Sequence, residues 1–225
     1  RHGAENVKAI YVDRINKSEC IYEKKSAKEI ADHFGVEFEM VAVKNSIKLS
    51  RDGHNIGLRD QLILVSALPI IFKFGEQNVW YGVTHDMQPA PLWTETKEAH
   101  SFLLKAIDRL FHCQLEVHFH CENGVHEFDI IKEIVQDREL LSKTSSCYTQ
   151  QNFREARHAQ MASKYPFFNS YHGCGSCIKC LRINGGILAF QDFEENYAHA
   201  WIEKTNDVQD ETISKLRPLV ADKFE

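Results

Sequence analysis

The chain has 225 residues and a formal net charge of −5, and 43% of its residues are hydrophobic. This length fits one α/β domain with an appendage, or two small domains, and can bury a substantial core without disulfide staples. No cluster of lysines or arginines stands out, so nucleic acid is not an expected partner. The longest apolar run, Leu62 to Phe72, contains Pro69 and is too short to cross a bilayer, so we expect a soluble protein.

The cysteine content indicates a reducing compartment. The chain has 7 cysteines, an odd number, and no cationic and apolar leader at its start. Both features argue against a secreted disulfide framework. We therefore expect free thiols and a cytoplasmic location.

The first elements in chain order form a strand, helix and strand. Arg1-His2-Gly3 is typical of a helix end with a glycine C-cap, which leads us to expect a segment upstream of Arg1. A strand over 7–13 follows, then a helix that begins near Ser18 and ends at Gly35, then a strand over 37–43. This order favours a parallel sheet with right-handed crossovers.

Strands and helices continue to alternate as far as Leu141. The elements that the pattern predicts are a buried helix over 59–74 despite Pro69, a strand over 79–83, a helix over 95–111, a strand over 115–119 and a helix marked by Phe128, Ile131, Ile134 and Val135. The predicted fold class is therefore α/β, with a mostly parallel sheet and helices on both of its faces.

From Lys143 onward the pattern changes. We expect a long polar and aromatic loop from Cys147 to Gly173, then a cysteine cluster, then helices over 181–190 and about 193–204. The acidic tail from Asp207 is typical of a solvated face or of disorder.

Three cysteines in a glycine-punctuated loop, Cys174, Cys177 and Cys180, predict a metal site. Zinc takes four ligands in a tetrahedron, and a site closed by four thiolates is structural. Cys147 is the preferred fourth ligand because it begins the same C-terminal region, and His172 is the reserve. The remaining cysteines are expected to be small buried residues: Cys20, Cys113 and Cys121.

The cysteine pattern also carries a resemblance. Thr144-Ser-Ser-Cys147-Tyr148, followed by Cys174-Gly-x-Cys177-x-x-Cys180-x-Arg182-x-x-Gly185, resembles the QueC family, the 7-cyano-7-deazaguanine synthases of queuosine biosynthesis. Looser matches occur in the same order along nearly the whole chain: the strand near Tyr11, Phe34-Gly35-Val36, Gly57-Leu-Arg59-Asp60 and Gly82-Val83.

The resemblance implies an ATP-dependent ligase of the pyrophosphate-loop type with an adenine-nucleotide hydrolase-like fold. Such an enzyme activates the carboxylate of 7-carboxy-7-deazaguanine with ATP and Mg²⁺, and ammonia then attacks to give an amide and a nitrile. The resemblance also implies a nucleotide-binding α/β domain over 1–142 and a zinc-anchored helical extension over 143–225. A homodimer and a protein partner remain open.

The sequence departs from that family in two places. The phosphate loop, Ser-Gly-Gly-x-Asp-Ser, does not occur in these residues, and we expect it upstream of Arg1, the alternative being that it has been lost. Where the family shows an acidic residue and Ser-Gly-Tyr-Pro-Asp, this chain has Thr84 to Trp93, so an altered substrate is plausible. The aromatic stretch 165–169 could cover a pocket or meet a partner.

Several other residues are candidates for the nucleotide or substrate cleft. Asp13 follows a strand at its carboxyl end, where open α/β sheets bind ligands, and His85 with Asp86 occupies a similar position. Arg59 begins a helix, and the resemblance suggests that it faces the nucleotide. Arg182 could approach the nucleotide or fold back on the metal site. Each of the first three positions also has a structural alternative. Asp13 could form a salt bridge within a turn, and His85 with Asp86 could cap a loop. Arg59 could be a solvent-exposed arginine at a helix start.

Further alternatives concern aromatic residues and the function as a whole. Trp80 and Trp93 fit a core better than a stacking role, and His118 with His120 gives only a weak indication of metal. Besides the synthase, the sequence allows a related enzyme that joins a deazaguanine-type carboxylate to another acceptor, such as a protein amine. It also allows a non-catalytic, zinc-stabilised binding module.

Overall fold

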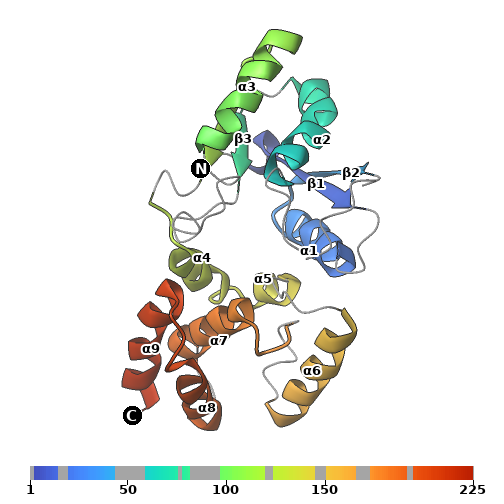
Figure 1. Ribbon diagram of the computed structural model, residues 1–225. Coiled ribbons are helices and arrows are strands. Elements are labelled where there is room, and N and C mark those ends of the chain that lie inside the picture. Colours follow the sequence, from blue (N-terminus) through green and yellow to red (C-terminus); the bar gives the residue numbers. More distant parts are fainter. Residues whose placement is uncertain are drawn as a thin grey trace. The chain divides into compact units, whose positions relative to one another are not determined.

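The structure is a computed structural model (Figure 1), and it describes residues 3–14, 20–43, 59–75, 78–81, 97–119, 124–144, 151–165, 173–191 and 195–224. The chain divides into two compact units. Unit 1 comprises residues 1–16 and 37–126, and unit 2 comprises residues 17–36 and 127–225.

Unit 1 contains small parallel sheets, as the alternating pattern predicts. Strands β1 (Lys8–Arg14) and β2 (Glu37–Val43) pair in parallel, with Lys8 opposite Glu37 and Arg14 opposite Val43. Strands β3 (Asn78–Tyr81) and β4 (Glu116–Phe119) form a second parallel pair. A short 3-10 helix, η1 (Ala4–Asn6), precedes β1.

Helix α2 (Arg59–Phe74) lies at the centre of the unit 1 core, together with α3 (Lys97–Phe111). The apolar side of α2 is buried against Ile107 of α3, Val117 of β4 and partly buried Ile10 of β1. Pro69 lies inside α2, where it removes one backbone hydrogen bond without ending the helix. The buried residues of this cluster are Leu64, Ala67, Leu68, Ile71, Ile107, Leu115 and Val117.

Unit 2 is helical in the residues that the structure describes. Its helices are α1 (Cys20–His33), α4 (Glu127–Ile134), α5 (Arg138–Lys143), α6 (Gln151–Lys164), α7 (Ile178–Phe190), α8 (Glu195–Thr205) and α9 (Glu211–Phe224). Helix α7 is buried along most of its length. One of its sides packs with Trp201 of α8 and Leu216 of α9, and another packs with Ile131 of α4 and Leu141 of α5.

Two consecutive glycines allow α7 to approach its neighbours closely. A Cβ atom added to Gly185 would overlap the ring of Trp201, and one added to Gly186 would overlap Ile131. Glycine weakens a helix interior relative to alanine, so the close packing on both sides explains its presence at these two positions.

The structure corrects several expectations for local structure. Residues 151–164 form helix α6, where a loop was expected. The acidic tail is not disordered over Glu211–Phe224, which form helix α9, and the other interpretation, a solvated face, agrees with the exposed side of that helix. Helix α9 buries Ile213, Leu216 and Val220, which recur at helical spacing among the charged residues. Gly3 has φ −65 and extended backbone, so it does not adopt the left-handed conformation of a glycine C-cap.

The chain as a whole is a mixed α/β protein with a C-terminal helical region that carries the cysteine cluster. In the described ranges, no helix combines the length and apolar character that crossing a bilayer requires.

Candidate metal centre

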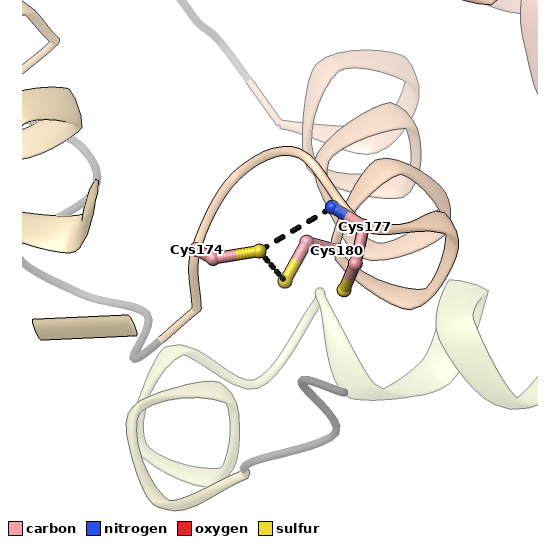
Figure 2. Close-up of side chains that lie close together, drawn as sticks. All are labelled: Cys174, Cys177 and Cys180. Atoms are coloured by element: carbon pink, nitrogen blue, oxygen red, sulfur yellow. Dashed lines mark hydrogen bonds between the residues drawn. The ribbon is translucent and has the colours of Figure 1, made fainter. Parts of the chain in front are cut away.

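The thiols of Cys174, Cys177 and Cys180 converge at the start of α7 (Figure 2). Their sulfur atoms all lie within 4.8 Å of one another, and the Sγ atoms of Cys174 and Cys180 are 3.9 Å apart. Cys174 is 1% exposed and Cys180 is 0% exposed, whereas Cys177 is partly exposed. None of the three forms a disulfide.

A tight turn brings the first two cysteines together. Gly175 has φ +67, in the left-handed region that glycine adopts without strain. The turn allows the backbone N–H of Cys177 to donate a hydrogen bond to the Sγ atom of Cys174, at 3.3 Å. The same Sγ atom lies 3.5 Å from Ser176 Oγ. A donor pointing at sulfur stabilises the thiolate form, which is the form that binds metal.

The third thiol is placed by the helix itself. Cys177 is the N-cap of α7, and Cys180 lies in the first turn, so both side chains project from the same end of one helix. The N-terminus of a helix carries partial positive charge, which favours thiolates there.

The three sulfur atoms suit tetrahedral zinc. Zinc–sulfur bonds of about 2.3 Å place the sulfurs of such a site about 3.8 Å apart. The separation between Cys174 and Cys180 is 3.9 Å, close to that value. A set of thiolates is also the donor chemistry that zinc prefers. The described residues therefore supply three ligands of a metal such as zinc.

Two cationic side chains from other helices reach this turn. Lys204 Nζ, on α8, donates to the carbonyl oxygen of Gly175 at 3.4 Å. Arg157 Nη1, on α6, donates to Ser176 Oγ at 2.8 Å. Burial lowers the pKa of Lys204, and the nearby thiols of all three cysteines act in the opposite direction. The sequence gives no local signal for either contact.

Arg182 ties α7 to two neighbouring helices. Its guanidinium donates from Nε and Nη2 to the carboxylate of Asp210, with distances between 2.6 and 3.2 Å, and it also pairs with Glu127 at the start of α4. Asp210 in turn accepts a hydrogen bond from the backbone N–H of Ile213 at 3.0 Å, which caps α9. The Arg182 side chain thus faces carboxylates within unit 2.

Polar residues also lie in the core beside α7. Asn184 donates to the Tyr197 hydroxyl at 2.8 Å, and Trp201 Nε1 donates to the carbonyl of Leu181 at 2.9 Å. Burial raises the pKa of Tyr197 far above its ordinary value, so this phenol stays protonated. These bonds fix the side of α7 that faces α8.

The other predicted site residues are distributed as follows. Asp13 lies near the end of β1 and is partly buried, and Arg59 is the first residue of α2. The side chain of Arg59 and all of His85, Asp86, Cys147 and His172 lie outside the described residues. The metal triad is the group of predicted site residues that the described part of the chain brings together.

His118 on β4 and Trp80 on β3, for which the sequence also allowed a metal-binding and a stacking role, contact each other and a neighbouring side chain. His118 Nε2 lies 3.0 Å from Asn78 Oδ1, and the His118 ring stacks on Trp80 with centroids 4.7 Å apart. Trp80 is 49% exposed, so the expectation that it belongs to the core is not met in the described residues. His120, Cys121 and Trp93 lie outside them.

A comparison of this chain with protein-family models and with curated proteins finds no match.

Proposed function

We propose that Cys174, Cys177 and Cys180 bind one zinc ion, with Cys147 as the fourth ligand. The observation that carries this proposal is the convergence of three sulfur atoms within 4.8 Å, two of them on fully buried residues. The spacing of the three cysteines places their thiols in one short segment, and thiolates grouped in this way are the donor set that zinc takes.

The position of α5 supports the choice of Cys147. Leu141 of α5 belongs to the same hydrophobic cluster as Cys174 and Cys180. Cys147 follows Thr144, the C-cap of α5, and three residues span at most about 11 Å. The short stretch of chain between α5 and Cys147, together with the packing of Leu141, supports Cys147 as the fourth ligand. His172, adjacent to the turn, remains the reserve.

A zinc ion held by four thiolates has no open coordination position, so its role is structural. It would join the segment after α5 to the start of α7, and so hold the helical region together. The proposed zinc ion therefore takes no part in the formation of the amide or of the nitrile.

We further propose that the whole protein is a QueC-like ATP-dependent ligase that forms a C–N bond. The spacing of the cysteines followed by Arg182, and the parallel pairing of β1 with β2, support this proposal. A carboxylate becomes a good electrophile when ATP converts one of its oxygens into part of a leaving group, and Mg²⁺ offsets the charge of the departing pyrophosphate. The adenine-nucleotide hydrolase-like sheet, covered by helices on both faces, belongs to the same proposal.

The roles of individual residues follow from their positions in the chain. Asp13, Arg59, His85 and Asp86 are proposed to line the nucleotide or substrate cleft. The contacts of Arg182 with Asp210 and Glu127 favour a role in holding α7 over contact with the nucleotide.

Metal analysis tests the zinc site. We expect about one zinc per chain in protein purified under reducing conditions, and loss of that zinc in Cys174→Ala and Cys147→Ala. Cys113→Ala is the matched control, because Cys113 is a free cysteine of unit 1 outside the triad. Protein without stoichiometric zinc contradicts the site. Zinc that is lost in His172→Ala and kept in Cys147→Ala assigns the fourth ligand to His172.

An activity assay tests the ligase. The natural full-length protein is incubated with ATP, Mg²⁺, ammonia and 7-carboxy-7-deazaguanine, and the products are followed by mass. A nitrile product supports the synthase. ATP turnover that depends on the carboxylate but gives no nitrile favours the related enzyme with another acceptor, and the absence of turnover favours the binding module.

A further inference from the structure

We propose that Lys204 and Arg157 are the charge partners of the thiolate centre, and that their positive charge strengthens metal binding by the three cysteines. This inference rests on the proposed zinc site. It assigns a role in that site to two residues that supply no ligand atom.

The geometry places both cations at the ligand-bearing turn. Gly175 and Ser176 are the two residues between the first two cysteines, and each accepts a hydrogen bond from one of the cations. Lys204 reaches the Gly175 carbonyl from α8, and Arg157 reaches Ser176 Oγ from α6. Ser176 Oγ itself lies 3.5 Å from the sulfur of Cys174. Two separate helices thus direct positive charge to the same turn.

The charge of the site gives a reason for this arrangement. A zinc ion with four thiolates carries a net charge of about −2. Burying net charge is costly unless opposite charge lies nearby, and Cys174 and Cys180 are both buried. Two cations at the turn match the net charge of about −2 of a zinc ion with four thiolates. A site with three thiolates and one neutral histidine would carry about −1, so the pair of cations also fits Cys147 better than His172.

The surroundings of Lys204 also support its role as a charge partner of the thiolates. Burial lowers the pKa of Lys204, and the guanidinium of Arg157 acts in the same direction, whereas the thiols of the three cysteines raise it. Among these groups the thiols are the anionic ones when ionised, and they favour the charged form of the lysine. Lys204 and Arg157 repel each other, so a shared anionic centre is what makes their proximity favourable.

Both cations reach water, and this makes the proposal testable by salt. Charges near the surface are screened within about 3 Å at 1 M salt, compared with about 10 Å at 0.1 M. A contribution from charge should therefore shrink at high salt. A contribution from the hydrogen bonds to Gly175 and Ser176 alone should not.

The test compares zinc affinity among variants of the full chain, by competition with a chromogenic chelator at about 0.1 M and 1 M salt. We expect Lys204→Met to weaken zinc binding about 5-fold at low salt, which is less than the roughly 10- to 100-fold effects of residues that contact metal ligands directly, because Lys204 is exposed and supplies no such contact. Lys204→Arg should recover most of the affinity. Arg157→Met should behave like Lys204→Met, and the double variant should lose more than either. The control is Lys215→Met, which removes a positive charge from α9 in the same unit, where Lys215 pairs with Glu211.

The outcomes separate this inference from the zinc site itself. Replacement of zinc by Co²⁺ gives an absorption spectrum that reports thiolate ligation, and this spectrum should be the same in wild type and variants. Wild-type protein that binds no zinc overturns the site and the inference together. Wild-type protein that binds zinc while Lys204→Met and Arg157→Met bind it equally well, or lose affinity equally at both salt concentrations, overturns the inference alone. If Lys204→Met does not fold, Arg157→Met and Arg157→Lys decide the question by the same comparison.

Discussion

Replacement of Arg182 by methionine tests whether this residue holds the helices of unit 2 together. The methionine keeps a long apolar side chain and removes the charge and the planar fork. Asp210 and Glu127 then lose their shared cation, and two carboxylates are left facing the same space on α7. The capping bond from Ile213 to Asp210 remains, so the loss reports on the ion pairs.

The magnitude follows from burial. Removing one partner of a fully buried ion pair costs about 3–5 kcal/mol. Here the side chain of Arg182 is 17% exposed, Glu127 is 23% exposed and Asp210 is 9% exposed, so water compensates part of the loss. We expect the free energy of unfolding to fall by about 2 kcal/mol. With a urea dependence of about 2 kcal/mol per M, the unfolding midpoint moves down by about 1 M.

The assay is urea unfolding of the zinc-loaded protein followed by circular dichroism. Arg182→Lys keeps the charge but loses the two-pronged contact with Asp210, and it should fall between wild type and methionine. Lys215→Met is the control, because its ion pair is solvent-exposed and contributes about 0.5 kcal/mol or less. The reasoning is refuted if Arg182→Met is as stable as Lys215→Met. A stable variant that binds ATP more weakly would instead support contact with the nucleotide.

Three further predictions concern unit 2. Chelation of zinc under reducing conditions should lower the free energy of unfolding by about 4 kcal/mol, relative to protein in free zinc at about 1,000 times the dissociation constant. Thermal unfolding with and without chelator measures this difference. The control variant Cys113→Ala should show the same dependence on zinc. Gly185→Ala should destabilise by about 1–2 kcal/mol in urea, because overlap with buried Trp201 outweighs the gain of about 1 kcal/mol in helix propensity; a more stable variant would contradict the packing. The Asp137 carboxylate accepts the backbone N–H of Leu140, and this bond lowers its pKa below the ordinary 3.8, so an NMR titration should find a midpoint below that value. Its contribution to stability is present above the ordinary pKa and is lost as pH falls through the lowered one, and a midpoint at or above 3.8 would argue against the cap.

Local patterns in the sequence predict much of unit 1. Strand β2 has the predicted bounds, because its alternating residues follow Gly35, which adopts φ +65 at the end of the preceding helix. Helix α2 also has the predicted bounds, since its apolar residues continue at helical spacing past Pro69. In both cases the residue pattern that predicts the element lies within the element itself or next to it.

The C-terminal region shows where such reasoning fails. Helix α9 was missed because its charged residues outnumber the three apolar residues that it buries, and only contact with α7 and α8 makes that narrow stripe sufficient. Helix α6 has a strongly polar composition that gives the same false impression of a loop.

The residues of the candidate site also differ in whether the sequence predicts them. The triad could be predicted, because its three thiols lie within one short segment and their spacing alone brings them together. Lys204, Arg157, Glu127 and Asp210 could not, because each reaches the site or its helix from a distant part of the chain. Contacts of that kind depend on how helices pack, and the sequence pattern of one helix does not contain them.

The unequal burial of the triad has a consequence for how an ion would leave or enter. Cys174 and Cys180 are sealed from solvent, and Cys177 alone among the three is reached by water. A competing chelator or an incoming metal must first meet the sulfur of Cys177. Among these three ligands, exchange should therefore begin at Cys177, the N-cap of α7, before the two buried thiolates.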